Sequence, residues 1–175
     1  MFDLGRCAET GGRLHLRGED AEDLAVISSC LQDALVPLGD MQYDQQARRF
    51  VLAVNRFRWE GCEPCTPAYA VAPGAAFERI ACGITFEGVR KVAVHGIDQR
   101  KRDLMLELLA IVTGEAAAAR VGPPAGEGGV TILLLFAGGG TIRLDADGIR
   151  CRLEDFGEPW PTPWRPQHRL GSEEI

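Results

Sequence analysis

Two cysteines lie three positions apart in Cys62-Glu63-Pro64-Cys65, a local motif with a recognised chemical use. Two thiolates at this spacing can bind one zinc ion or form a redox-active disulfide. A structural zinc site needs four ligands, and without a second closely spaced pair the remaining candidates are Cys82 and His95. Cys62 and Cys65 are the candidate metal or redox residues, and the competing interpretation is two cysteines in an ordinary loop.

A second set of candidates is Trp160, Trp164 and Arg165, which lie in the proline-rich segment Gly157–Pro166. High proline density favours polyproline II, and indoles on such a segment can dock a protein partner. In the alternative interpretation both indoles fold back over an apolar face of the sheet, because indoles seldom stay fully exposed. These three residues are the candidate partner-binding residues.

Basic residues between positions 90 and 102 can meet a phosphate or an acidic partner if the fold gathers them at one end of the sheet. Acidic neighbours dilute their charge, so a solvated edge or loop is the competing interpretation. These basic residues are Arg90, Lys91, Arg100, Lys101 and Arg102. The histidines have no serine or cysteine in a known nucleophile context, so the sequence predicts no catalytic residue and no cofactor.

The composition predicts a globular chain, with 175 residues, 46% of them hydrophobic and 25% charged. A formal net charge of −6 repels nucleic-acid phosphates on average, so nucleic acid is not an expected partner. The sequence has neither an export signal nor an apolar run of membrane-spanning length, so we expect a cytoplasmic protein with reduced thiols and no membrane contact.

Two β-hairpins are the clearest elements in the sequence. The apolar run that starts at Val130 continues through Gly138-Gly139-Gly140 to Leu144, and the glycines supply the positive φ angles of a tight turn. A second hairpin is predicted over 39–57, around the polar segment 44–48. Frequent Gly and Pro residues, which interrupt helices and strands, predict a loop over 60–76.

Helical spacing of Leu24, Ile27, Leu31 and Leu35 predicts an amphipathic helix from about Asp20 to Val36, ending before Pro37. Alternation predicts strands over 13–17, 77–87, 89–95 and 148–155. The stretch 104–112 is ambiguous between helix and strand, and its neighbours favour strand. The stretch 114–129 is predicted to be a surface loop.

The predicted architecture is an α+β domain, mainly antiparallel sheet, with one N-terminal amphipathic helix and a proline-rich C-terminal strap. Similar turns at Glu87-Gly88-Val89-Arg90 and Asp147-Gly148-Ile149-Arg150 allow two related sheet halves or two ordinary turns. We expect residues 1–12 and 169–175 to be tails of a single domain over 13–168.

Three segments resemble an uncharacterised bacterial family of small proteins classed as a domain of unknown function. These segments are Asp20–Ser28, Asn55–Glu60 and Phe136–Leu144, and the resemblance spans about Leu14 to His168. It implies no activity and no site residues, and the Cys62–Cys65 loop is not part of the pattern.

The sequence therefore favours a non-enzymatic cytoplasmic module that binds an unidentified protein partner. A metal-binding or redox protein that uses Cys62 and Cys65 is the alternative, and an enzyme with a cleft between sheet halves is a third possibility.

Overall fold

The computed structural model describes residues 12–61, 77–121 and 128–163, and over these ranges the chain is nearly all β. The strands are β1 His15–Gly18, β2 Ala34–Pro37, β3 Met41–Asp44, β4 Arg49–Phe57, β5 Phe77–Glu87, β6 Val89–His95, β7 Met105–Thr113, β8 Val130–Phe136, β9 Thr141–Ala146 and β10 Cys151–Thr162. The helices are α1 Ala21–Cys30 and α2 Glu115–Val121, with short 3-10 turns η2 Leu38–Asp40, η3 Trp59–Gly61 and η4 Ala137–Gly139.

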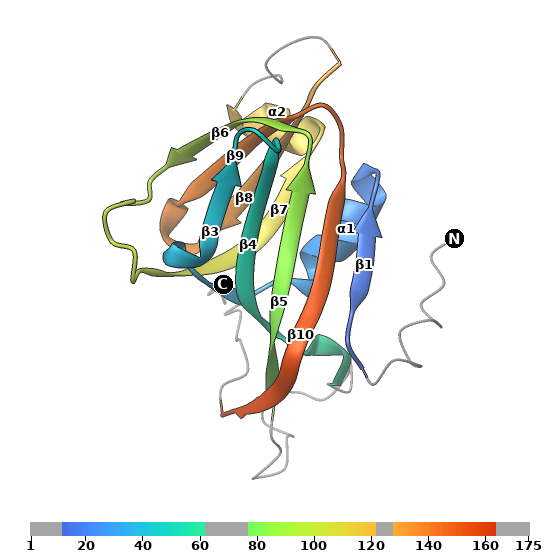
Figure 1. The fold of residues 1–175 in the computed structure, drawn as a ribbon, viewed down its shortest axis with the longest axis vertical. Helices are drawn as coiled ribbons and strands as arrows, with labels where there is room; N and C mark the ends of the chain where they lie inside the picture. The colour runs from blue at the N-terminus through green and yellow to red at the C-terminus, as the bar shows by residue number, and fades with distance from the viewer. Residues whose placement is uncertain (1–11, 62–76, 122–127, 164–175) are drawn as a thin grey trace, which may run out of the picture.

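The strands form one antiparallel sheet in the order β1-β10-β5-β4-β2-β7-β8-β9-β6, and β3 pairs with β4 beside this path. A single residue pair, Leu35 with Asn55, joins β2 to β4, and the sheet bends there. Strands β1, β10, β5, β4 and β3 form the front layer in Figure 1, with the strands from β7 to β9 behind them.

The hydrophobic core lies between the two layers because alternate residues of each strand point inward. Side chains of Leu52, Ile84 and Leu153 from the front layer share one buried cluster with Leu134 and Leu144 from the back layer. The side chains that point outward from the front layer are accessible to solvent and are therefore available to contact a ligand or partner.

Helix α1 packs against β1 and β7 and buries Leu24 and Ile27. Asp20 caps its N-terminus by accepting a hydrogen bond from the Asp23 amide at 2.8 Å. The amide of Ile111 in β7 donates to the Ser28 hydroxyl at 2.8 Å, which ties the helix to the back layer.

The predicted α+β class is wrong, because α1 and α2 are short and ten strands make up most of the described chain. The predicted helix over 20–36 stops at Cys30, and its last part is strand β2. Asp33 has a positive φ of 61°, and its amide donates to the carbonyl of Leu108 at 2.8 Å. This contact starts β2 beside β7, so sheet pairing overrides the helical spacing of Leu31 and Leu35.

The predicted strap is also corrected, because β10 continues through the prolines to Thr162. The register shifts between Phe156 and Trp160, and Gly157 in that interval has a φ of +76°. β1 pairs only with the first residues of β10, so one side of the later residues has no partner strand in the described chain. Prolines are tolerated on such an edge, since their missing N–H breaks no pairing there.

Several other predictions are confirmed. The 130–144 hairpin is β8 and β9, with positive φ at Gly138 and Gly139, and the 39–57 hairpin is β3 and β4. Residues 104–112 lie almost entirely in strand β7. The loop predicted over 114–129 is partly wrong, because its alanine-rich start forms helix α2.

The two similar glycine turns lie side by side where the chain crosses between layers. The amide of Glu87 donates to the carbonyl of Arg150 at 2.9 Å, and the amide of Asp147 donates to the carbonyl of Gly88 at 3.1 Å. Charged side chains from both turns, and from the ends of β1 and β10, therefore gather at this end of the fold.

Candidate anion-binding site

The structure does not bring the sequence-predicted site residues together. Cys62, Cys65, Trp164 and Arg165 lie outside the described residues, as does most of the predicted 60–76 loop. Trp160 lies on β10 opposite Arg79 and is 37% exposed.

The candidates proposed to complete a zinc site lie apart. Cys82 faces the core from the middle of β5, and burial raises the pKa of its thiol. His95 is exposed at the end of β6 in the other layer. In the described ranges, no three His, Cys, Asp or Glu side chains are grouped so that they could hold a metal ion.

The basic residues between positions 90 and 102 do not form one cluster. Arg90 lies at the start of β6 and contacts Asp147, with 3.4 Å between its Nε and a carboxylate oxygen. Arg102 follows the end of β6 and donates to the carbonyl of Gly39 at 2.9 Å. These positions agree with a solvated edge or loop for the set, although Arg90 recurs in a different group.

Among the residues that the structure describes, Arg56 is the most deeply buried cation, with no exposed side-chain surface. It is the last inward-facing residue of β4, and its Nε and Nη2 donate to the two carboxylate oxygens of Asp155 at 2.7 and 2.6 Å. Its Nη1 and Nη2 donate to Glu60 at 3.0 and 2.6 Å, and Nη1 also donates to the carbonyl of Phe57 at 3.3 Å.

These bonds use all five N–H groups that a guanidinium offers. Burial disfavours the charge of Arg56, but the hydrogen bonds that it donates to Asp155 and Glu60 outweigh this effect, so its pKa is raised. Asp155 also accepts from the amide of Leu14 at 2.8 Å, which fixes the entry to β1. Because no donor of Arg56 remains for a ligand, this centre joins β1, β4 and β10 and has a structural role.

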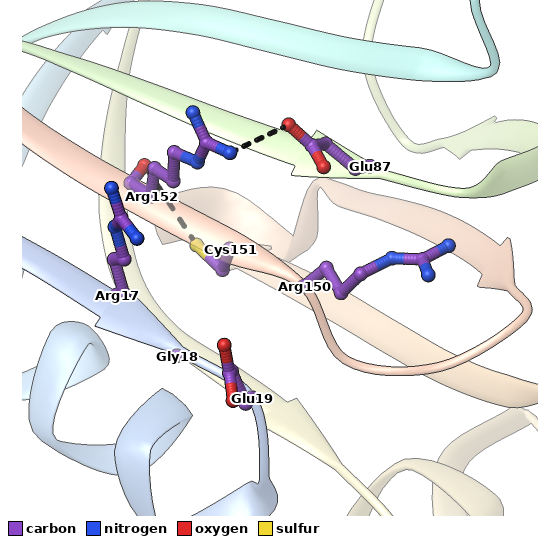
Figure 2. Close-up of a pocket in the computed structure, with 7 residues that line it drawn as sticks. All are labelled: Arg17, Gly18, Glu19, Glu87, Arg150, Cys151 and Arg152. Atoms are coloured by element: carbon purple, nitrogen blue, oxygen red, sulfur yellow. Dashed lines mark hydrogen bonds and ion pairs between the residues drawn. The ribbon is translucent and has the colours of Figure 1, made fainter.

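A different group of arginines surrounds a pocket at the end where the chain crosses between layers. The pocket is open to solvent and has a volume of about 80 Å³ between the end of β1, the start of β10 and the end of β5. Seven residues line it: Arg17, Gly18, Glu19, Glu87, Arg150, Cys151 and Arg152 (Figure 2).

Arg17 and Arg152 lie directly opposite each other in the register of β1 and β10, and both side chains are exposed. Figure 2 shows the two side by side, with Arg152 reaching towards Glu87. The closest approach of that pair is 3.5 Å, between Arg152 Nη2 and a Glu87 carboxylate oxygen. Within the ranges that the structure describes, the Arg17 guanidinium makes no hydrogen bond or ion pair.

Arg150 lines the same pocket but extends away from Arg17 and Arg152 in Figure 2. Its guanidinium lies over Gly88, where an added Cβ would be 2.5 Å from Arg150 Nη2. Gly88 has a φ of +71°, so glycine suits this position in both backbone conformation and space.

The chemistry available in the pocket is anion binding. A guanidinium presents planar N–H donors that fit carboxylate and phosphate oxygens, and two adjacent guanidiniums repel each other until an anion lies between them. Cys151 does not add a nucleophile, because its side chain is buried and burial raises its pKa to about 12.

Sequence reasoning missed Arg17 and Arg152 because they meet only through the pairing of β1 with β10. One sequence signal could have pointed to this site: both arginines lie on short strands with alternating apolar residues, at positions predicted to face water. The repeated glycine turn was a second signal, since it marks the corner beside this pocket.

A family model described as "Protein of unknown function (DUF2948)" matches residues 14–168. No curated protein and no solved structure matches the chain. None of the helices in the described part is both long and apolar enough to span a membrane.

Proposed function

Because the chain belongs to the DUF2948 family, which has no known function, we propose its function from the geometry: it is a non-enzymatic cytoplasmic binding module. The pocket between Arg17 and Arg152 binds one anionic group, a carboxylate or a phosphate, of its partner. The observation that carries this proposal is the direct opposition of these two arginines across β1 and β10 at an open pocket.

The contrast with Arg56 supports this assignment. Arg56 is enclosed by Asp155 and Glu60 and has every donor in use. Arg17 and Arg152 lie at the surface, where the Glu87 carboxylate approaches only one of them, at 3.5 Å. Adjacent guanidinium groups at a concave surface are suited to binding an oxyanion from solution.

The absence of a nucleophile in the pocket supports binding rather than catalysis. Of the cysteines in the described part of the chain, only Cys151 lines the pocket, and it is buried with a raised pKa. The other charged lining residues are three arginines and two glutamates. The exposed Trp160 lies on β10 as well, and we assign it to the contact surface for a larger partner.

Thermal unfolding at constant ionic strength tests the proposal. Replacing chloride by inorganic phosphate or by acetate is expected to raise the Tm of the wild-type protein, because an anion that binds only the folded state stabilises it. The increase is expected to disappear in the Arg17→Gln/Arg152→Gln double variant. It is expected to remain in Arg13→Gln, which removes an exposed arginine paired with Glu158. An equal increase in the double variant would overturn the proposal.

A further inference from the structure

We propose that the partner is a protein that presents an acidic peptide segment, and that this segment contacts two adjoining arginine groups. The first group is the Arg17–Arg152 pocket, and the second, the arginine corner, consists of Arg48, Arg90 and Arg150. This inference rests on the proposed function and specifies its ligand.

The arginine corner already shows how it holds a carboxylate. Asp147 places one oxygen 2.6 Å from Arg48 Nη2 and the other 3.4 Å from Arg90 Nε. All three side chains are partly exposed, at 46% for Arg48, 32% for Arg90 and 41% for Asp147. A single carboxylate thus bridges two guanidiniums at the surface, which shows that this group of arginines can bind a carboxylate.

Arg150 connects the corner to the pocket. It lines the pocket, and its guanidinium lies over Gly88, where a Cβ would also be 3.6 Å from a carboxylate oxygen of Asp147. No hydrogen bond or ion pair holds the Arg150 side chain within the described ranges. Arg150 is therefore placed to contact a ligand that extends from one group to the other.

The pocket and the arginine corner together carry a net positive charge, unlike the chain as a whole. Counting the described residues, five arginines contribute to the two groups, against three carboxylates, those of Glu19, Glu87 and Asp147. The chain as a whole has a formal net charge of −6. A local excess of positive charge on an acidic protein orients an approaching acidic segment towards this end.

The alternation of charge favours a peptide over a nucleic acid. Glu87 and Asp147 lie among the arginines, and a nucleic-acid strand has a phosphate at every nucleotide, so some phosphates would face these carboxylates. A peptide can place acidic side chains at intervals that match the arginines. Among the described residues, those that line the pocket include no aromatic side chain that could stack on a base.

Fluorescence anisotropy with labelled hexaglutamate is the direct test, with inorganic phosphate and a single-stranded oligodeoxythymidine as comparison probes. Hexaglutamate is expected to bind more tightly than free glutamate and to dissociate as salt is added. The Arg48→Gln/Arg150→Gln double variant is expected to weaken hexaglutamate binding by about tenfold. The Arg48→Gln single variant, which leaves every pocket-lining residue in place, is expected to keep the Tm increase caused by phosphate. The Arg13→Gln control is expected to bind hexaglutamate like the wild type.

The outcomes separate this inference from the proposed function. If phosphate still stabilises the protein but the Arg48→Gln/Arg150→Gln variant binds hexaglutamate unchanged, the acidic-peptide inference is overturned and the anion pocket stands. Tighter binding of the oligonucleotide than of hexaglutamate also overturns the inference. If phosphate fails to stabilise the wild-type protein, the proposed function itself fails.

Discussion

Arg17 of β1 and Arg152 of β10 face each other across a strand pair, so two positive charges lie side by side on the front layer. Like charges in directly opposed positions destabilise a sheet, and here the nearest carboxylate to Arg152 is 3.5 Å away. A binding site that costs some stability when empty is a common compromise between stability and function.

Replacing Arg17 by Gln is therefore expected to stabilise the protein in chloride, by about 0.5 kcal/mol, because it removes this repulsion. Urea unfolding at low salt measures the change. The gain is expected to shrink at high salt, where the repulsion is screened. A loss of stability at low salt would show that the guanidinium of Arg17 is held by favourable contacts.

Replacing Arg56 by Met is expected to destabilise the protein by about 3–5 kcal/mol, because Asp155 is then left as a buried, uncompensated carboxylate. Urea unfolding again gives the free energy, and Arg13→Met is the exposed control, expected to change it by less than about 1 kcal/mol. The Arg56→Met/Asp155→Leu double variant is expected to recover part of the loss. A small effect of Arg56→Met alone would contradict the structural role of this centre.

Replacing Gly88 by Ala is expected to cost about 1–2 kcal/mol, since a φ of +71° disfavours any residue with a Cβ. The new methyl group would also displace the Arg150 guanidinium, so hexaglutamate binding is expected to weaken. Gly148→Ala at the similar turn is the matched control, because Gly148 lacks a positive φ and has no atom within 4 Å of the added Cβ. Equal stability of the two variants would argue against this account of the corner.

Alkaline pH is expected to destabilise the protein through its buried thiols. Burial raises the pKa of Cys151 from 9.0 to about 12, so above pH 9 the unfolded chain loses a proton that the native state keeps. Stability then falls as pH rises from 9 towards 12, by about 1.4 kcal/mol per pH unit for this thiol.

Urea unfolding at several pH values measures this slope. Cys151→Ala is expected to reduce the slope, while Cys82, whose pKa is also raised by burial, keeps its share. An unchanged slope in Cys151→Ala would show that this thiol ionises equally well in the native and unfolded states.

The sequence predicted local pairing well because the signal for a hairpin is contained in one short segment. The apolar run from Val130 and the glycines before Thr141 fix β8, its turn and β9 without help from the rest of the chain. The end of α1 was wrong because Leu31 and Leu35 fit both a helix and a turn followed by a strand. Only the contact of Asp33 with Leu108 decides between them.

The candidate site was not predictable from spacing. Arg17 and Arg152 come from opposite ends of the chain, and strand order places β10 beside both β1 and β5. No short sequence motif contains both arginines, and each arginine alone looks like a solvated strand residue. The similar turns at Gly88 and Gly148, which adjoin the pocket, were visible in the sequence. They suggested an internal repeat, not a binding site.

The central claim is that Arg17 and Arg152 bind an anion, and NMR of the arginine side-chain Nε–Hε groups during a phosphate titration tests it most directly. The account predicts that the signals of Arg17 and Arg152 shift progressively, while Arg56, whose Nε is hydrogen-bonded to Asp155, stays in place. Signals of Arg17 and Arg152 that do not move, or that move no more than those of Arg13 and Arg56, would contradict it.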